Sequence, residues 1–224
     1  MGKSPSKKKN KYKLKKWILA VAAAGTLAAG SYVVAKRMVI PGEKVVAIVD
    51  GDTFEIANKQ RIRLTSLDAP EMGNCFAKEA KSALEKKIAG KKVILKDVIT
   101  DQFRRITALV YVDGELINEY MIKNGFAVYL LNTPGQHEVL KKANEFARDR
   151  KLGIYSPECF QLLPPVPKCT IKGNIIQDSK TKVYLTPDCL YYDNVIVEKY
   201  RGETWFCTEA EARTAGFTKS PNCK

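Results

Sequence analysis

The sequence predicts an α+β protein, with a five-stranded OB-fold barrel and three helices, followed by a small C-terminal accessory domain. Residues 44–159 contain five short strand-like runs separated by turn signals, with helical spacing between some of them. This alternation is typical of a small closed barrel, for which the OB-fold is the best match. A proline-rich stretch then precedes a cysteine-containing end. The composition, 45% hydrophobic and 28% charged, is that of a globular chain.

The predicted strands of the barrel are short apolar runs. Asp50-Gly51-Asp52 and Ala57-Asn58-Lys59 are turn-like breaks that separate the first three. The strands are expected at Lys44–Val49, Thr53–Ile56, Arg61–Leu67, Lys92–Ile99 and Ile106–Val112.

Three segments of residues 44–159 are predicted to be helices. In the first, Phe76, Ala80, Ala83, Leu84 and Ile88 follow helical spacing up to Gly90. Asn124-Gly125 ends the second, and Gly153 ends the third. The helices are expected at Phe76–Ala89, Leu116–Lys123 and Gln136–Arg150.

The N-terminus is interpreted as an export or anchoring segment. Residues 1–16 form a basic tail with eight lysines, and residues 17–35 carry no charge. Nineteen helical residues span roughly 28 Å, close to the hydrocarbon core of a bilayer. Residues 17–35 are therefore either a transmembrane anchor or a cleaved signal peptide, with Ala28-Ala29-Gly30 as its small residues. A buried helix of the soluble domain is the third interpretation.

The basic tail leads us to expect that residues 38–224 face outward from the cell membrane or are secreted from a bacterial-type envelope. The six cysteines agree with an oxidising compartment, and no Cys-x-x-Cys pair occurs. Disulfides are the favoured interpretation, and a four-cysteine zinc site in the last sixty residues is the alternative.

The domain boundaries follow from these features. Residues 44–159 form the predicted barrel domain, residues 160–168 a proline-rich linker, and residues 169–224 the accessory domain. Cys75 and Cys159 both precede the linker, and the other four cysteines follow it. We therefore expect a disulfide between Cys75 and Cys159, with two unpaired buried cysteines as the alternative.

Charge and histidine content exclude several functions. The formal charge is +14, but residues 1–37 hold ten Lys and Arg and no acid, which leaves 28 bases against 24 acids. The remainder is only mildly basic, so composition is weak evidence for nucleic-acid binding. The single histidine excludes acid–base catalysis by two histidines and paired-histidine zinc sites.

Three carboxylates and an arginine stand out in the barrel segment. Asp52 lies at a hairpin, and Asp68 and Glu71 follow the third predicted strand. Oxygen ligands from two strand ends suit a hard cation such as Ca²⁺, although Asp-Gly and Asp-x-Pro are also ordinary turn signals. Arg63 lies in the same apolar run as Asp68. Their opposite parity places them on opposite faces of an ideal strand, so a twist or bulge must bring them together.

The motifs VDGDTF, RIRLTSLDAPE, TDQFRR, YVDGELINEYMIKNGFA and RKLGIYS occur in this order over about 115 residues. Together they resemble the staphylococcal nuclease (thermonuclease) family. The resemblance implies the OB barrel with three helices and Ca²⁺-dependent hydrolysis of DNA and RNA that leaves 3′-phosphate ends.

The same resemblance implies a role for each motif residue. It assigns Asp52, Asp68 and the Ala69 carbonyl to Ca²⁺, Glu71 to the attacking water, and Arg63 and Arg105 to the phosphate. Arg104 and Phe103 are assigned to nucleic-acid binding. The family's Asp-Lys-Tyr-Gly-Arg loop is Asp101–Arg105 here, without its lysine, tyrosine or glycine. The family's terminal-phosphate tyrosine also has no clear match, since Leu131 falls near its place and Tyr129 is two residues away.

The C-terminal motifs KCTIKGNI, YLTPDCLYYD and ETWFCTEAEARTAGF resemble a module appended to exported bacterial nucleases, and more distantly a four-cysteine zinc domain. Their aromatic pairs either stack on bases or form a small core.

The sequence predicts an exported or membrane-tethered nuclease that acts on DNA and RNA, with Ca²⁺ as its cofactor and no evident protein partner. The alternative is a nuclease-like OB module that binds nucleic acid or an envelope partner without cleaving it. An envelope scaffold that uses the C-terminal module for attachment could coexist with activity.

Overall fold

The computed structural model describes residues 39–101, 103–131, 136–177 and 179–223. The predicted basic tail (1–16) and apolar segment (17–35) lie outside these residues. Within the described ranges, no helix has both the length and the apolar character needed to cross a membrane.

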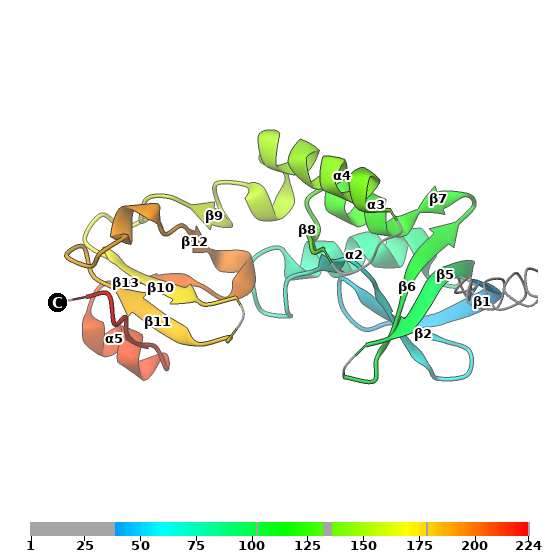
Figure 1. The fold of residues 1–224 in the computed structure, drawn as a ribbon, viewed down its shortest axis with the longest axis horizontal. Coiled ribbons are helices and arrows are strands. Elements are labelled where there is room, and N and C mark those ends of the chain that lie inside the picture. Colours follow the sequence, from blue (N-terminus) through cyan, green and yellow to red (C-terminus); the bar gives the residue numbers. More distant parts are fainter. Residues whose placement is uncertain (1–38, 102, 132–135, 178, 224) are drawn as a thin grey trace, which may run out of the picture. The chain divides into compact units, whose positions relative to one another are not determined.

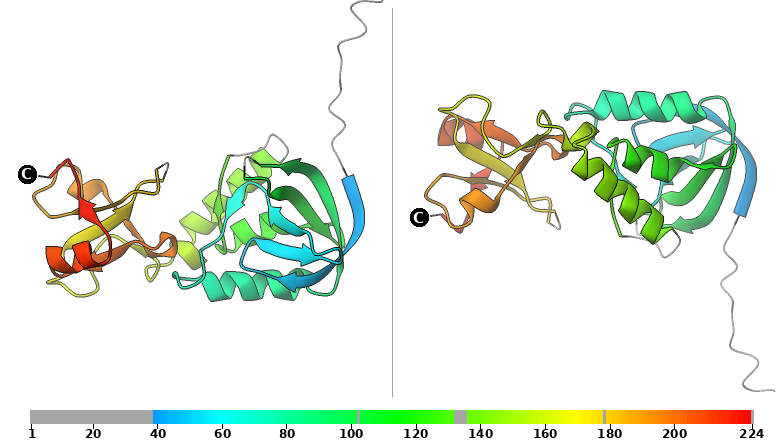
Figure 2. Two further views of the ribbon diagram at one scale, coloured as in Figure 1. Left: turned by 90° about the horizontal axis from the view of Figure 1, so that it is seen from below. Right: turned by 90° about the horizontal axis from the view of Figure 1, so that it is seen from above.

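Five strands form a closed ring (Figures 1 and 2). Antiparallel pairs join β1 to β2, β2 to β3, β1 to β5 and β5 to β6, and the parallel pair β3–β6 closes the ring. The ring confirms the predicted α+β class, and each of its strands overlaps a predicted one. Its members are β1 (Val39–Ile48), β2 (Thr53–Ile56), β3 (Arg61–Leu64), β5 (Lys92–Thr100) and β6 (Ile106–Val112).

Three helices accompany the ring: α2 (Ala77–Ile88), α3 (Ile117–Lys123) and α4 (His137–Asp149). Helix α2 contacts β1 and α3, and α3 contacts β6 and α4 (Figure 1). Four of the apolar positions that predicted α2, Ala80, Ala83, Leu84 and Ile88, belong to the core of the ring, as helical periodicity requires, whereas the half-buried Phe76 precedes α2 and packs against the cluster of Ala147, Ile154, Tyr155 and Tyr200. Short strands complete this part: β4 (Leu67–Asp68) pairs with β8 (Val128–Tyr129), and β7 (Glu115–Leu116) extends β6.

The C-terminal segment contains a four-stranded sheet in the order β13-β10-β11-β14. Its strands are β10 (Ile171–Ile175), β11 (Lys182–Leu185), β13 (Thr204–Phe206) and β14 (Thr218–Lys219), with α5 at Glu209–Thr214. Phe206 belongs to its small apolar cluster, as the core interpretation expected. Disulfides Cys169–Cys207 and Cys189–Cys223 use all four cysteines of this segment, so the zinc interpretation is wrong.

The third disulfide joins Cys75 to Cys159, which is the pairing expected from the sequence. The C-terminal segment contacts this corner. The Cys75 N–H donates to the Lys199 carbonyl, and the Lys199 N–H donates to the Cys159 carbonyl. Strand β12 (Val197–Glu198) also pairs with β9 (Phe160–Gln161). The first residues of the predicted linker are therefore part of a β-ladder.

Candidate functional site

Asp52 is placed by the tight turn between β1 and β2. Asp50 accepts a hydrogen bond from the Asp52 N–H at 3.0 Å, which closes the turn. Gly51 packs so closely that an added Cβ would lie 2.8 Å from the Cβ atoms of Ala69 and Ala80. The glycine thus lets the turn approach α2. As a result, the Asp52 carboxylate is only 2% exposed.

Arg63 connects Asp52 to Asp68. It lies in β3 directly opposite Thr53 of β2. Its Nη1 donates to Asp52 Oδ1 at 2.6 Å, and its Nη2 donates to Asp68 Oδ1 at 2.5 Å. The Arg63 side chain is 16% exposed, whereas the Asp68 side chain is 42% exposed. These charge-assisted bonds hold the two carboxylates on one cation.

The predicted single strand Arg61–Leu67 is wrong, and the difference explains how Arg63 meets Asp68. The chain leaves β3 after Leu64, and Ser66 adopts φ 60° before β4 begins at Leu67. This left-handed residue resets the alternation of side chains. Arg63 and Asp68, which an unbroken strand would place on opposite faces, can therefore point to the same side.

Asn118 stabilises this break, and the sequence analysis missed it. Its fully buried side chain donates to the carbonyls of Thr65 (2.8 Å) and Ala108 (3.3 Å) and accepts the Val110 N–H (2.9 Å). It thereby ties α3 to β6 and to the turn after β3. The available signal was a polar residue on the apolar face that carries Ile117, Met121 and Ile122.

The environment of Asp52 favours its neutral form. Burial raises the pKa of Asp52 to about 7, and the nearby Asp50 also raises it. The Arg63 guanidinium and the Ala69 N–H, which donates to Asp52 Oδ2 at 3.0 Å, only partly oppose this effect. A second positive charge would therefore stabilise the ionised carboxylate.

Arg63 and Arg105 line the same cavity of about 360 Å³. Phe103 and Asp101 also line it. Asp101 organises the loop, because its Oδ1 accepts the N–H groups of Phe103 and Arg105 and its Oδ2 accepts Arg105 Nε at 2.7 Å. Desolvation acts to raise the pKa of Asp101, but these hydrogen bonds outweigh it and the pKa is lowered.

Phe103 is an exposed aromatic residue of this cavity. Its side chain is 68% exposed. The guanidinium carbon of Arg105 lies 5.1 Å from the centre of its ring, within the range of a cation–π contact. The loop therefore places the Arg105 guanidinium group, which can bind an anion, beside the flat apolar ring of Phe103.

The structure does not bring every predicted residue into contact with this cluster. Glu71 is exposed, and among the described residues its carboxylate has no hydrogen-bond or ion-pair partner. Arg104 is also exposed; it adopts φ 60°, and its N–H donates to the Asp101 carbonyl. Ala69 is buried and bonds to Asp52 through its N–H. Hydrogen bonds thus join Asp52, Arg63, Asp68 and Ala69, and the cavity joins Arg63, Phe103 and Arg105.

The donor chemistry of the cluster fits a hard cation. In the part of the chain that the structure describes, no three acidic, histidine or cysteine side chains converge. The residues that would hold such a cation are those implied by the family resemblance, the Asp52 and Asp68 carboxylates and the Ala69 carbonyl, with water or substrate oxygens completing the shell. The raised pKa of Asp52 supports this fit, because a cation at its carboxylate would offset the cost of burial.

Comparison with known proteins agrees with this geometry. A family model described as "Staphylococcal nuclease homologue" matches residues 61–157. An "Uncharacterized endonuclease" of Escherichia coli is 32% identical over 117 residues, which is 50% of this chain and 76% of that protein.

Two plant proteins are also similar. The "Probable staphylococcal-like nuclease CAN4" of Oryza sativa subsp. japonica is 37% identical over 101 residues, or 45% of this chain and 20% of its own. The "Staphylococcal-like nuclease CAN1" of Arabidopsis thaliana is 28% identical over 121 residues, or 54% of this chain and 36% of its own. The similarity thus covers about half of this chain.

Proposed function

Because the chain belongs to the staphylococcal nuclease homologue family, we propose that it hydrolyses phosphodiester bonds of DNA and RNA with Ca²⁺ as cofactor and leaves 3′-phosphate ends. The observation that carries the proposal is the cavity shared by Arg63 and Arg105, with two carboxylates bonded to Arg63. We further propose that the ring of five strands is an OB-fold barrel.

The two arginines would hold the scissile phosphate. Each guanidinium group offers a planar fork of donors that matches phosphate oxygens. Phosphoryl transfer places negative charge on those oxygens, and donors already fixed in place stabilise it without reorganisation. Asp101 fixes Arg105 through Nε, which leaves the terminal nitrogens for the substrate.

Arg63 must change partners when a phosphate binds. Its two terminal nitrogens are bonded to Asp52 and Asp68. A Ca²⁺ ion held by these carboxylates would supply the compensating positive charge at the phosphate. Arg63 can then donate to the phosphate without leaving Asp52 as a buried, uncompensated charge.

Glu71 would orient or deprotonate the attacking water. Its carboxylate is exposed and, among the described residues, unpaired, so it is available to accept a proton or a hydrogen bond. It follows Asp68 by only three residues, across Pro70.

We also propose that this activity operates outside the cytoplasm, with the chain either anchored through residues 17–35 or secreted. The support is the apolar segment of the sequence and the three disulfides, which persist in oxidising compartments.

The test is cleavage of single-stranded DNA and of RNA by the full chain. We expect cleavage with Ca²⁺, loss of cleavage with chelator, and less cleavage with Mg²⁺, whose strict octahedral geometry suits this flexible oxygen set poorly. End-group analysis should show 3′-phosphates. Undiminished cleavage in chelator would overturn the Ca²⁺ assignment, and nucleic-acid binding without cleavage would support the module that only binds.

A further inference from the structure

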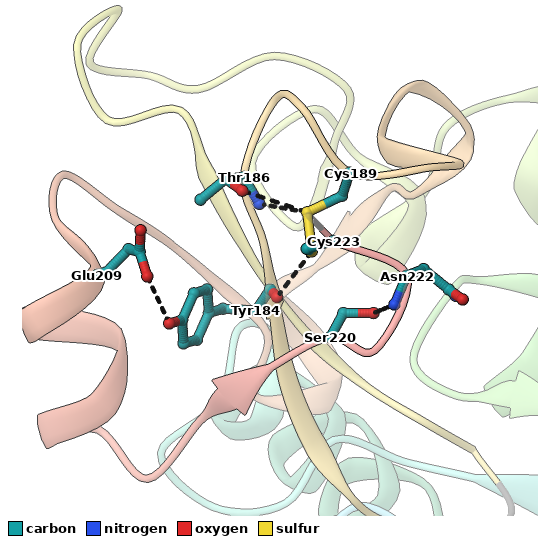
Figure 3. Close-up of a disulfide and its surroundings, with 7 residues drawn as sticks. All are labelled: Tyr184, Thr186, Cys189, Glu209, Ser220, Asn222 and Cys223. Atoms are coloured by element: carbon teal, nitrogen blue, oxygen red, sulfur yellow. Dashed lines mark hydrogen bonds between the residues drawn. A yellow bond between two sulfur atoms is a disulfide. The ribbon is translucent and has the colours of Figure 1, made fainter.

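The C-terminal segment contains a depression that the proposed nuclease chemistry does not use. Residues 187–194 and 221–223 line it, and its volume is about 780 Å³. It lies at the Cys189–Cys223 disulfide, whose surroundings Figure 3 shows. None of the residues assigned to nuclease activity belongs to it.

The loop that forms the depression is fixed from several sides. The disulfide joins Cys189 to Cys223, which both line the depression, and the Leu190 N–H donates to the Asn222 carbonyl at 2.9 Å. Beneath it, the ammonium group of Lys172 donates to the carbonyls of Tyr192 (2.8 Å) and Val195 (2.7 Å), and this lysine is only 3% exposed. A loop held in this way is preorganised, so a ligand would not have to order it.

The fixed loop presents two large apolar side chains to solvent. Leu190 is 59% exposed and Tyr191 is 60% exposed. Tyr191 also adopts φ 68°, a conformation that is costly for a bulky residue and that concentrates at binding sites. The adjacent Tyr192 differs, because its hydroxyl donates to the Thr170 carbonyl and its ring packs on the Lys172 ammonium group. The Tyr192 side chain therefore contributes to the packing of this segment, whereas the side chains of Leu190 and Tyr191 are exposed to solvent.

The charge of the depression disfavours a nucleic acid. Asp188 and Asp193 line it, and no lysine or arginine does so among the described residues. The amides of Asn194 and Asn222 complete its polar lining. Carboxylates beside a phosphate backbone would repel it, whereas carboxylates and amides bond well to hydroxyl and amide groups.

We propose that this depression binds a polysaccharide of N-acetylated amino sugars. The Tyr191 ring would stack on the apolar face of a sugar ring, and Leu190 would pack on an acetamido methyl group. The Asp193 carboxylate and the Asn194 and Asn222 amides would bond the sugar hydroxyls and the acetamido group. Such binding would attach the enzyme to a polysaccharide matrix, independently of its catalysis.

The test is calorimetric titration of the full chain, in a detergent without a sugar headgroup, with an N-acetylglucosamine hexamer. A matched titration with cellohexaose, which lacks the acetamido groups, measures their contribution. Purified peptidoglycan and chitin, used as insoluble probes, then distinguish two sources of the same sugar. We expect hexamer binding at least about tenfold tighter than cellohexaose binding, a difference of about 1.4 kcal/mol.

Three variants test whether the hexamer binds in this depression. Tyr191→Asn removes the ring but keeps a residue that tolerates φ > 0, so it should weaken binding about tenfold or more without unfolding the segment, as loss of a stacking contact does. Tyr191→Phe should bind like the wild type. Ile176→Ala, a matched change at another exposed aliphatic of the segment, should also bind normally.

Two sets of results would overturn the proposal. The first is no binding of the hexamer, or unchanged binding by a folded Tyr191→Asn protein. The second is preferential binding of a lysine-rich peptide or of single-stranded DNA through Tyr191, which would assign the depression to another partner. Nuclease activity should be the same in all three variants, so the outcome is independent of the proposed function.

Discussion

Among the carboxylates of the site, Asp52 is the one most deeply buried. It is almost fully buried, and burial raises its pKa to about 7 although Arg63 is bonded to it. Above that pH the folded protein carries an ionised carboxylate that the unfolded chain would solvate better. Proteins retain such strained charges where function requires them.

We predict that Asp52 makes metal-free stability fall with pH. Between about 4 and 7, the folded state retains the Asp52 proton that the unfolded chain, with its ordinary pKa of 3.8, has lost. The free energy of unfolding should therefore decrease as pH rises through this window. Urea unfolding in chelator at pH 5 and pH 8 measures the change.

The Asp52→Asn variant is the control for this prediction. It keeps an oxygen for the Ala69 N–H and removes the charge, so its stability should lack this pH dependence. At pH 8 without metal it should exceed the wild type by about 1 kcal/mol or more, the value of one pKa unit. It should also lose Ca²⁺-dependent cleavage. A less stable Asp52→Asn protein at pH 8 would show that the ion pair with Arg63 outweighs burial.

At the scale of elements, the site depends on the break between β3 and β4. The break lets Arg63 and Asp68 meet, and Asn118 of α3 bonds to its Thr65 carbonyl. A helix and a strand edge are thus joined through one buried amide. Loss of that amide removes its bonds to the Val110 N–H and the Thr65 carbonyl, whereas the Ala108 carbonyl keeps the Thr65 N–H as a partner.

We predict that Asn118→Ala lowers the free energy of unfolding by about 2 kcal/mol or more, since two buried groups lose this partner and each unsatisfied buried group costs about 1–3 kcal/mol. The matched control is Asn124→Ala, at the exposed end of the same helix, where the side chain donates to the Tyr120 carbonyl. That change should cost about 1 kcal/mol or less. Chemical denaturation measures the free energy of unfolding of both variants. Equal losses in the two would contradict the role given to Asn118.

The elements predicted from the sequence are those with a local signal. The five ring strands and three helices follow apolar periodicity and turn residues, and their ends agree with the structure within a few residues, apart from the longer β1 and the shorter β3. The split of Arg61–Leu67 into β3 and β4 was not predictable, because the left-handed conformation of Ser66 depends on the tertiary structure and has no local sequence signal. The two arginines share a cavity only because β3 pairs with β6, a contact distant in sequence.

At the scale of the whole molecule, the C-terminal segment is bonded to the nuclease part and not merely tethered to it. Tyr200 packs in a cluster with Ala147, Ile154 and Tyr155. Asn74 donates to the Tyr200 carbonyl at 3.2 Å, next to the Cys75–Cys159 disulfide. Asp52, Arg63, Asp68 and Arg105 are not part of this contact surface.

We predict that a chain truncated after Pro167 still cleaves single-stranded DNA with Ca²⁺ but unfolds at a temperature several degrees lower. The cavity and the carboxylates lie entirely in the part that remains. The apolar cluster around Tyr155 loses Tyr200, and β9 loses its partner strand. Thermal melting and a cleavage assay on the same sample check both statements, and a folded but inactive truncated protein would show that the C-terminal segment completes the site.

Arg63 and Arg105 are proposed to form the phosphate site, and the decisive measurement is the single-turnover rate of cleavage of single-stranded DNA with saturating Ca²⁺. Arg63→Lys and Arg105→Lys keep the charge and remove the planar fork, whereas Arg61→Lys and Arg104→Lys are matched changes at exposed neighbours. We predict that the first pair loses about 10²-fold or more in rate, the typical effect of removing a donor to developing charge, while the second pair stays within about threefold. Wild-type rates in folded Arg63→Lys and Arg105→Lys proteins, or a larger loss in Arg104→Lys than in Arg105→Lys, would contradict the claim.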